Sequence, residues 1–236
     1  GAQRVAVILV KTKGATFTPY FTKEQIEEMI FRGDVQKFFK EASYGKMWLD
    51  EEKSKVYGWY EVENLNIDSW DDIPNTSSYE FIKLIDPDID FSQFDRVMFG
   101  GAVNNNTYGG WADTVGKRTY FTSDGNLFIS VGVFGIGSSM NFIFSHELGH
   151  NLGVMHANSW NCDQGGVQGN CQHLEYGNPY DVMGGVFSLQ HFNGYFKEVF
   201  QWLNKPVINI ASSGRYNLEP LEYQEAVVAK INRSGT

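Results

Sequence analysis

The residues best suited to chemistry lie in Ser138–His156, SSMNFIFSHELGHNLGVMH. His146 and His150 are four positions apart, so on a helix both imidazoles project from one face about one turn apart and can share a metal ion. Glu147 follows the first histidine, where its carboxylate can reach a metal-bound water without becoming a ligand. The apolar residues around the motif indicate a buried helix. This pattern predicts a pair of metal ligands with a separate general base.

A third ligand requires the chain to reverse after this helix. In a continuous helix, His156 would lie about 240° around the axis from His150 and ~9 Å further along it, facing away from the metal. Gly153 stands where a left-handed C-cap would turn the chain, since glycine adopts positive φ without steric cost. We therefore expect Gly153 to end the helix and His156 to complete a site of three histidines.

The segment HELGHNLGVMH resembles the extended zinc signature HExxHxxGxxH of the metzincin metallopeptidases. The later segment Tyr176–Gly184, YGNPYDVMG, resembles the Met-turn of that family. Together with the aromatic helix and β-segment that follow, it is most similar to the gametolysin-like branch. The chain departs from some metzincins at Gly185, where those proteins have a tyrosine that assists at the metal. Tyr176 and Tyr180 are expected to be structural.

The resemblance implies a function and a role for each motif residue. One catalytic Zn²⁺ is bound by His146, His150 and His156. Glu147 activates the zinc-bound water that attacks the peptide bond, so the expected activity is that of a zinc-dependent endopeptidase acting on extended polypeptides. Met183 forms an apolar floor beneath the imidazoles.

Two alternatives remain open. In another class of zinc peptidase the third ligand is a downstream glutamate, for which Glu175 is the nearest candidate. A catalytically impaired, zinc-stabilised adhesion or binding module would keep the ligands without turnover, although the intact Glu147 favours an enzyme. The remaining histidines, His173 and His191, are expected to be solvated or hydrogen-bonded.

The bulk composition limits the partners. The chain has 236 residues, of which 42% are hydrophobic, enough for one substantial core. Its formal net charge of −9 argues against nucleic acid, whose binding proteins usually carry a basic patch. No apolar run approaches the ~18 residues of a membrane span. We expect a monomer with a polypeptide substrate as its partner.

The cysteines indicate the compartment. Cys162 and Cys171 lie in one polar loop, which predicts a local disulfide in a secreted or extracellular protein. The alternatives are two free thiols or a small metal site with His173. The first residues lack a signal-peptide pattern, so an export signal is expected to lie outside this sequence.

The order of elements predicts an α/β (α+β) metzincin-like domain with a twisted, mostly parallel sheet and an antiparallel edge strand. A catalytic domain is expected over 1–204, with an upper subdomain over residues 1–152 and a lower subdomain over residues 153–204. Residues 205–236 are expected to begin a β-rich C-terminal module that is truncated here. Apolar runs predict strands at residues 4–10, 47–49, 56–62, 96–99, 207–210, 216–218 and 226–231. Helical spacing predicts helices over 22–39 with a break at Gly33, over 77–85, from residue 138 to the turn at Gly153, and over 189–203. Thr22 and Gln25 fit a capping box at the start of the first.

A further strand is expected just before the zinc helix. Apolar residues of Leu127–Phe134 alternate with Phe128, Ser130 and Gly132, which predicts a strand with two distinct faces. In metzincins the substrate lies antiparallel along an edge strand at this place. The resemblance therefore implies a substrate-binding edge strand made of Leu127, Phe128, Ile129, Ser130 and Val131.

A calcium site has no recognisable motif. Asp86, Asp88 and Asp90 alternate as in an EF-hand loop, but Phe91 stands at the glycine position and Val97 at that of the bidentate glutamate. We expect a solvated turn instead.

Overall fold

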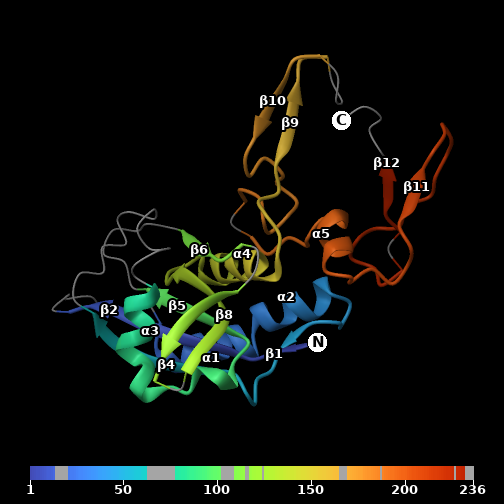
Figure 1. Ribbon diagram of the computed structural model, residues 1–236. Coiled ribbons are helices and arrows are strands. Elements are labelled where there is room, and N and C mark those ends of the chain that lie inside the picture. The colour runs from blue at the N-terminus through green and yellow to red at the C-terminus, as the bar shows by residue number, and fades with distance from the viewer. Residues whose placement is uncertain are drawn as a thin grey trace.

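The protein is a mixed α/β structure built on a mostly parallel sheet (Figure 1). The computed structural model describes residues 1–13, 21–62, 78–101, 109–114, 117–123, 125–164, 169–186, 188–225 and 227–231. The strands of the sheet are β2 (Val5–Thr12), β4 (Lys55–Val62), β5 (Arg96–Gly101), β6 (Gly110–Ala112), β7 (Arg118–Thr122) and β8 (Gly125–Gly135). Their order is β4-β2-β5-β8-β6, with β7 also paired to β8. Only β6 and β7 run antiparallel to their neighbour β8.

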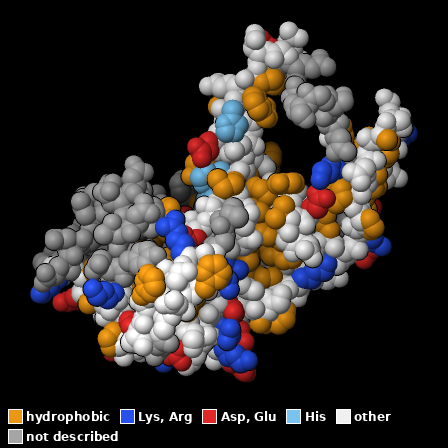
Figure 2. All heavy atoms as spheres, in the orientation of Figure 1, with side chains coloured by type: hydrophobic (Ala, Val, Ile, Leu, Met, Phe, Trp, Pro, Cys, Tyr) orange, Lys and Arg blue, Asp and Glu red, His pale blue; other side chains and the backbone are white. Residues whose placement is uncertain are grey.

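Helices and smaller sheets surround this sheet. The helices are α1 (Lys23–Phe31), α2 (Asp34–Ala42), α3 (Ser78–Ile85), α4 (Met140–Leu152) and α5 (Gly194–Val199), with 3-10 turns η2 (Asp86–Asp88) and η3 (Phe91–Gln93). The paired strands are β1 (Ala2–Gln3) with β3 (Trp48–Leu49), β9 (Ser159–Cys162) with β10 (Cys171–Leu174), and β11 (Ile208–Ile210) with β12 (Ala229–Ile231). The hairpin β9–β10 stands out from the body of the molecule (Figures 1 and 2).

Strand β2 is buried on both faces, as its continuous apolar sequence predicts. Alternate residues point to opposite sides of the sheet. Val5, Val7 and Leu9 join the core that also contains residues of α1, α2 and α4. Ala6, Ile8 and Val10 join a second core, which contains residues of α3. The sheet thus supports α4 on one face while α3 covers the other.

One predicted helix agrees with the structure and another differs from it. The segment 22–39 forms two helices, α1 and α2, separated at Gly33, and Thr22 with Gln25 makes the predicted capping box. The helix predicted over 189–203 is wrong in length, because α5 begins only after Asn193. The Asn193 side chain accepts from Phe196 N–H at 3.0 Å and fixes that start. A positive φ of 59° at Gln201 lies just beyond its end.

The expected edge strand pairs with neighbouring strands in the structure. The residues Leu127–Ile129 pair antiparallel with β7, and Ser130 and Val131 pair with β5. On its other side, Val131 exchanges two hydrogen bonds with Asp113, N–H to carboxylate at 3.0 Å and carbonyl to N–H at 2.9 Å. The described strand that ends the sheet beside α4 is β6. Its sequence, Gly-Trp-Ala, is too short and glycine-rich to be recognised as a strand from pattern alone.

Three other predictions concern residues 216–218, the aspartates and the domain division. Residues 216–218, predicted as a strand, pair with no described strand and are exposed. Asp90 accepts from Ser92 N–H at 3.0 Å, and Asp95 pairs with Arg4 at 2.8 Å, so these carboxylates serve separate local contacts. The division at residue 204 stays a prediction.

Candidate metal centre

The helix α4 ends where the sequence requires it to end. Gly153 has φ 109° and ψ 19°, and its N–H donates to the carbonyl of His150 at 2.8 Å. A side chain at this position would meet nothing within 4 Å, so the demand for glycine comes from the positive φ. The predicted reversal of the chain after the second histidine is therefore confirmed.

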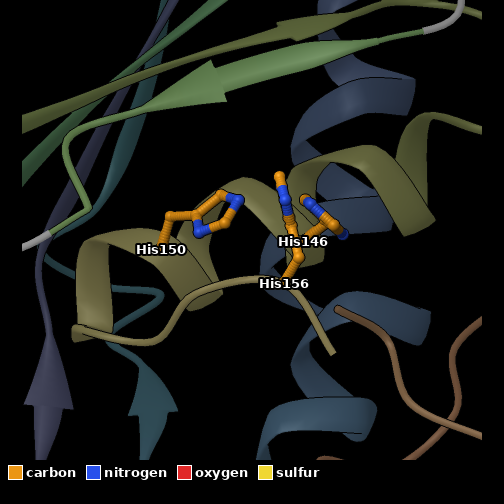
Figure 3. Close-up of side chains that lie close together, drawn as sticks. All are labelled: His146, His150 and His156. Carbon is orange, nitrogen blue, oxygen red and sulfur yellow. The ribbon is translucent and has the colours of Figure 1, made fainter. Parts of the chain in front are cut away.

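Three imidazoles converge after this turn. His146 and His150 project from α4, and His156 returns from the following loop to face them (Figure 3). One ligand atom from each lies within 4.8 Å of the others. Among the residues that the structure describes, no other three or more His, Cys, Asp or Glu side chains converge in this way.

Each helix histidine is oriented by a backbone carbonyl. The Nδ1 of His146 lies 2.8 Å from the carbonyl oxygen of Val182, and the Nδ1 of His150 lies 2.8 Å from that of Val154. A carbonyl only accepts, so each Nδ1 carries the proton and donates it. The lone pair of each imidazole is then on Nε2, the nitrogen left for a metal.

The third histidine is oriented by Glu175. Nδ1 of His156 donates to the Glu175 carboxylate at 2.6 Å, so Nε2 of His156 also keeps its lone pair. Glu175 therefore supports a ligand and is not part of the converging set. This geometry favours His156 over Glu175 as the third ligand. The Tyr176 ring lies 3.8 Å from the His156 ring, between centroids, and packs against its face.

Burial sets the protonation of the site. It lowers the pKa of His146 to about 3 and that of His150 to about 4, with neighbouring imidazoles adding to the effect. Both are thus neutral, as metal binding requires. Burial also raises the pKa of Glu147 well above its ordinary value. The Oε2 atom of Glu147 has no hydrogen-bond partner among the described residues, so this carboxylate retains an acceptor for a proton or a water.

Glu147 lies against the edge strand at a glycine. A Cβ on Gly110 of β6 would overlap the Glu147 carboxylate group. Only glycine lets this strand approach so closely, and both residues line a cavity of about 320 Å³. The cavity continues along Phe142, Tyr176 and Gly185.

Met183 packs under the helix from the other side. It is fully buried, and its sulfur would lie 2.5 Å from a Cβ placed on Gly149, the residue before His150. Asp181 holds the turn, because its carboxylate accepts from the N–H of Met183 at 2.8 Å and of Asn193 at 2.7 Å. Asp181 was not predicted from the sequence, where its only signal is an acidic residue directly before Val182 and Met183.

Asn151 and its partners were also missed. The Asn151 amide donates to the carbonyls of Asp113 and Val131, both at 3.1 Å, and so ties the end of α4 to the sheet. Arg96 donates to the Asn151 carbonyl at 2.6 Å, where a helix C-terminus favours a cation. The partners come from segments distant in sequence, and no local pattern announces them.

The other histidines lie outside the centre. His173 sits on β10 beside Trp160, and His191 contacts Glu41 and Lys197. Tyr180 is 79% exposed. Cys162 and Cys171 form the predicted disulfide, so free thiols and a cysteine metal site are both excluded. None of the described helices is long and apolar enough to cross a bilayer.

Comparison with known proteins adds little to this geometry. No known family profile and no curated protein matches the chain. Metalloproteinase-II from Bacteroides fragilis is similar in structure, with 17% identity and a TM-score of 0.45 over 86% of this chain and 54% of that one. A chaperone–substrate complex is similar at 15% identity and a TM-score of 0.40, over 82% of this chain and 33% of that one. This chain thus spans about half and about a third of those proteins.

Proposed function

We propose that this protein is a zinc-dependent endopeptidase of the metzincin type, close to the gametolysin-like branch. The observation that carries the proposal is the convergence of three imidazoles whose Nδ1 atoms are already bonded, beside a buried glutamate with a free oxygen. Three imidazole nitrogens are a donor set typical of catalytic zinc sites, which keep a fourth position for water or substrate.

The ligand histidines hold the metal through Nε2. Zn²⁺ bound to three neutral imidazoles keeps its full charge and supplies Lewis-acid activation of a water molecule and of the scissile carbonyl. Glu175 and the carbonyls of Val154 and Val182 keep the rings in the tautomer that binding requires. Met183 is the proposed apolar floor of the site and its turn the proposed Met-turn.

Glu147 acts as the general base. Its carboxylate accepts a proton from the attacking water and returns that proton to the leaving amine. Burial raises its pKa, which makes the carboxylate a stronger proton acceptor. The backbone of Gly110 packs against Glu147 and limits where its carboxylate can move.

The substrate is proposed to lie extended along the outer edge of β6. This edge is proposed in place of Leu127–Val131, because Leu127–Ile129 pair with β7 and Ser130 and Val131 pair with β5. Strand β6 is next to α4 and is the last of the described strands in the sheet, so an extended peptide can pair with its backbone. One substrate side chain would enter the cavity beside Phe142 and Ile143, whose walls favour an apolar group. The disulfide supports a secreted protein.

Incubation with a diverse peptide library, with and without a zinc chelator, tests the proposal. We expect internal cleavage that stops on chelation and returns when zinc is restored. Activity that persists after complete removal of the metal would contradict the proposal. A zinc-loaded protein that cleaves no peptide would favour the binding-module alternative.

A further inference from the structure

The hairpin β9–β10 joins directly to the metal centre at both of its ends. β9 begins three residues after His156, and β10 is followed by Glu175 and Tyr176, which contact that ligand. A fully extended chain spans at most ~3.6 Å per residue, so Trp160 of β9 lies within roughly 15 Å of His156. The hairpin therefore starts at the rim of the proposed cleft.

A disulfide links the two strands of this hairpin. A two-stranded hairpin is marginally stable alone in water. Here Cys162 and Cys171 are opposite one another in the strand register, and their disulfide links the strands toward the tip. A strand pair fixed in this way loses little conformational freedom when it binds a partner.

One face of this hairpin carries exposed aromatic rings. Trp160 and His173 are paired across the strands, so both side chains project from the same face, and their ring centroids are 5.7 Å apart. Trp160 is 61% exposed, which is high for the residue type most favoured in binding hot spots. Hydrophobic side chains are visible along the hairpin in Figure 2.

We propose that this hairpin is a substrate-binding arm, which contacts apolar side chains of the polypeptide beyond the residues at the scissile bond. The inference rests on the proposed peptidase function. The occupant follows from continuity: β10 leads into Tyr176, which lines the proposed catalytic cavity, so the hairpin adjoins the cleft that a polypeptide substrate would occupy. At about 3.3 Å per extended residue, the contact falls within about five residues of the scissile bond.

Peptide extension tests this arm. The best hexapeptide from the library is compared with versions lengthened by eight residues at either end, carrying either alternating Leu and Ser or only Gly and Ser. On one side, the apolar extension should raise kcat/KM roughly tenfold. That gain should vanish in Trp160→Ala and shrink in the double variant Cys162→Ser/Cys171→Ser, while hexapeptide cleavage stays unchanged.

Phe121→Ala is the matched control. Phe121 is an aromatic residue on β7 and is 72% exposed, so its loss should leave the extension gain intact. Equal gains from apolar and Gly-Ser extensions, no gain from either, or a gain that survives in Trp160→Ala would overturn the arm while leaving the peptidase proposal standing. Absence of any cleavage, hexapeptide included, would remove both.

Discussion

Two buried clusters of ionisable side chains differ in what they leave unbonded. At the metal centre, His146, His150 and His156 each use Nδ1 for a protein partner and point Nε2 at a shared space. The second cluster surrounds Lys197, which is fully buried, and its polar groups bond to one another. Both clusters contain side chains with shifted pKa values. Only the metal centre keeps unbonded nitrogen lone pairs that can bind a metal ion.

The second cluster fastens the C-terminal segment to the helices. The Lys197 ammonium donates to the Tyr44 hydroxyl at 2.9 Å, to the Leu221 carbonyl at 2.7 Å and to His191 Nδ1 at 3.2 Å. His191 in turn donates through Nε2 to Glu41 at 3.2 Å. Lys197 thus uses its three N–H groups within the protein. Burial and a shifted pKa therefore do not by themselves mark a site; converging free lone pairs do.

The largest effect should come from Glu147→Gln, which keeps the shape of the side chain but removes the base. We expect kcat to fall by roughly 10³-fold or more, because no other carboxylate replaces it. Zinc content, measured by atomic absorption, should equal that of the wild type. Near wild-type turnover would show that the free oxygen of Glu147 has no role in catalysis.

The next largest effect is a difference in zinc affinity between a variant of the ligand His156 and a variant of its supporting residue Glu175. His156→Ala should release the metal at nanomolar zinc, whereas Glu175→Gln should weaken zinc binding by about 10–100-fold, since it removes only an orienting charge. Competition with a fluorescent chelator measures both. If Glu175→Gln lost zinc completely while His156→Ala kept it, the assignment of the two residues would be reversed.

A smaller change should follow from Gly110→Ala. The added methyl overlaps Glu147, so kcat should fall about tenfold through displacement of the base, with zinc affinity unchanged. Gly137→Ala is the control, because a Cβ there meets nothing within 4 Å. Steady-state kinetics decide, and equal kcat in the two variants would remove the role of this contact.

The smallest effect concerns stability around Lys197. Burial lowers its pKa from 10.5 to about 8, so the folded protein releases this proton before the unfolded chain does. Stability should therefore rise as pH increases from about 8 toward 10, by roughly 1–3 kcal/mol. Urea unfolding at several pH values, compared with Lys197→Met, measures it. A variant with the same pH slope as wild type would contradict the low pKa.

The sequence predicted the centre better than its surroundings. His146, Glu147, His150, Gly153 and His156 lie within eleven consecutive residues, so helix geometry and one glycine were enough to place them. The buried strand β2 and the Thr22 capping box were also predicted, because their signals are local.

The missed features depend on distant segments of the chain. Gly110 meets Glu147, and Asn151 meets Asp113, only after β6 and β7 pair with β8. The same pairing gives Leu127–Ile129 of the expected edge strand a neighbour in β7. Alternation along a strand indicates its two faces but carries no information about whether its sides are already paired.

Zinc-edge X-ray absorption on the purified protein, loaded with one equivalent of zinc, tests the central claim most directly. We predict three imidazole nitrogens at about 2.0–2.1 Å from the metal, and two in His156→Ala reconstituted at high zinc concentration. A wild-type spectrum dominated by oxygen ligands, or one that His156→Ala leaves unchanged, would contradict the three-histidine centre.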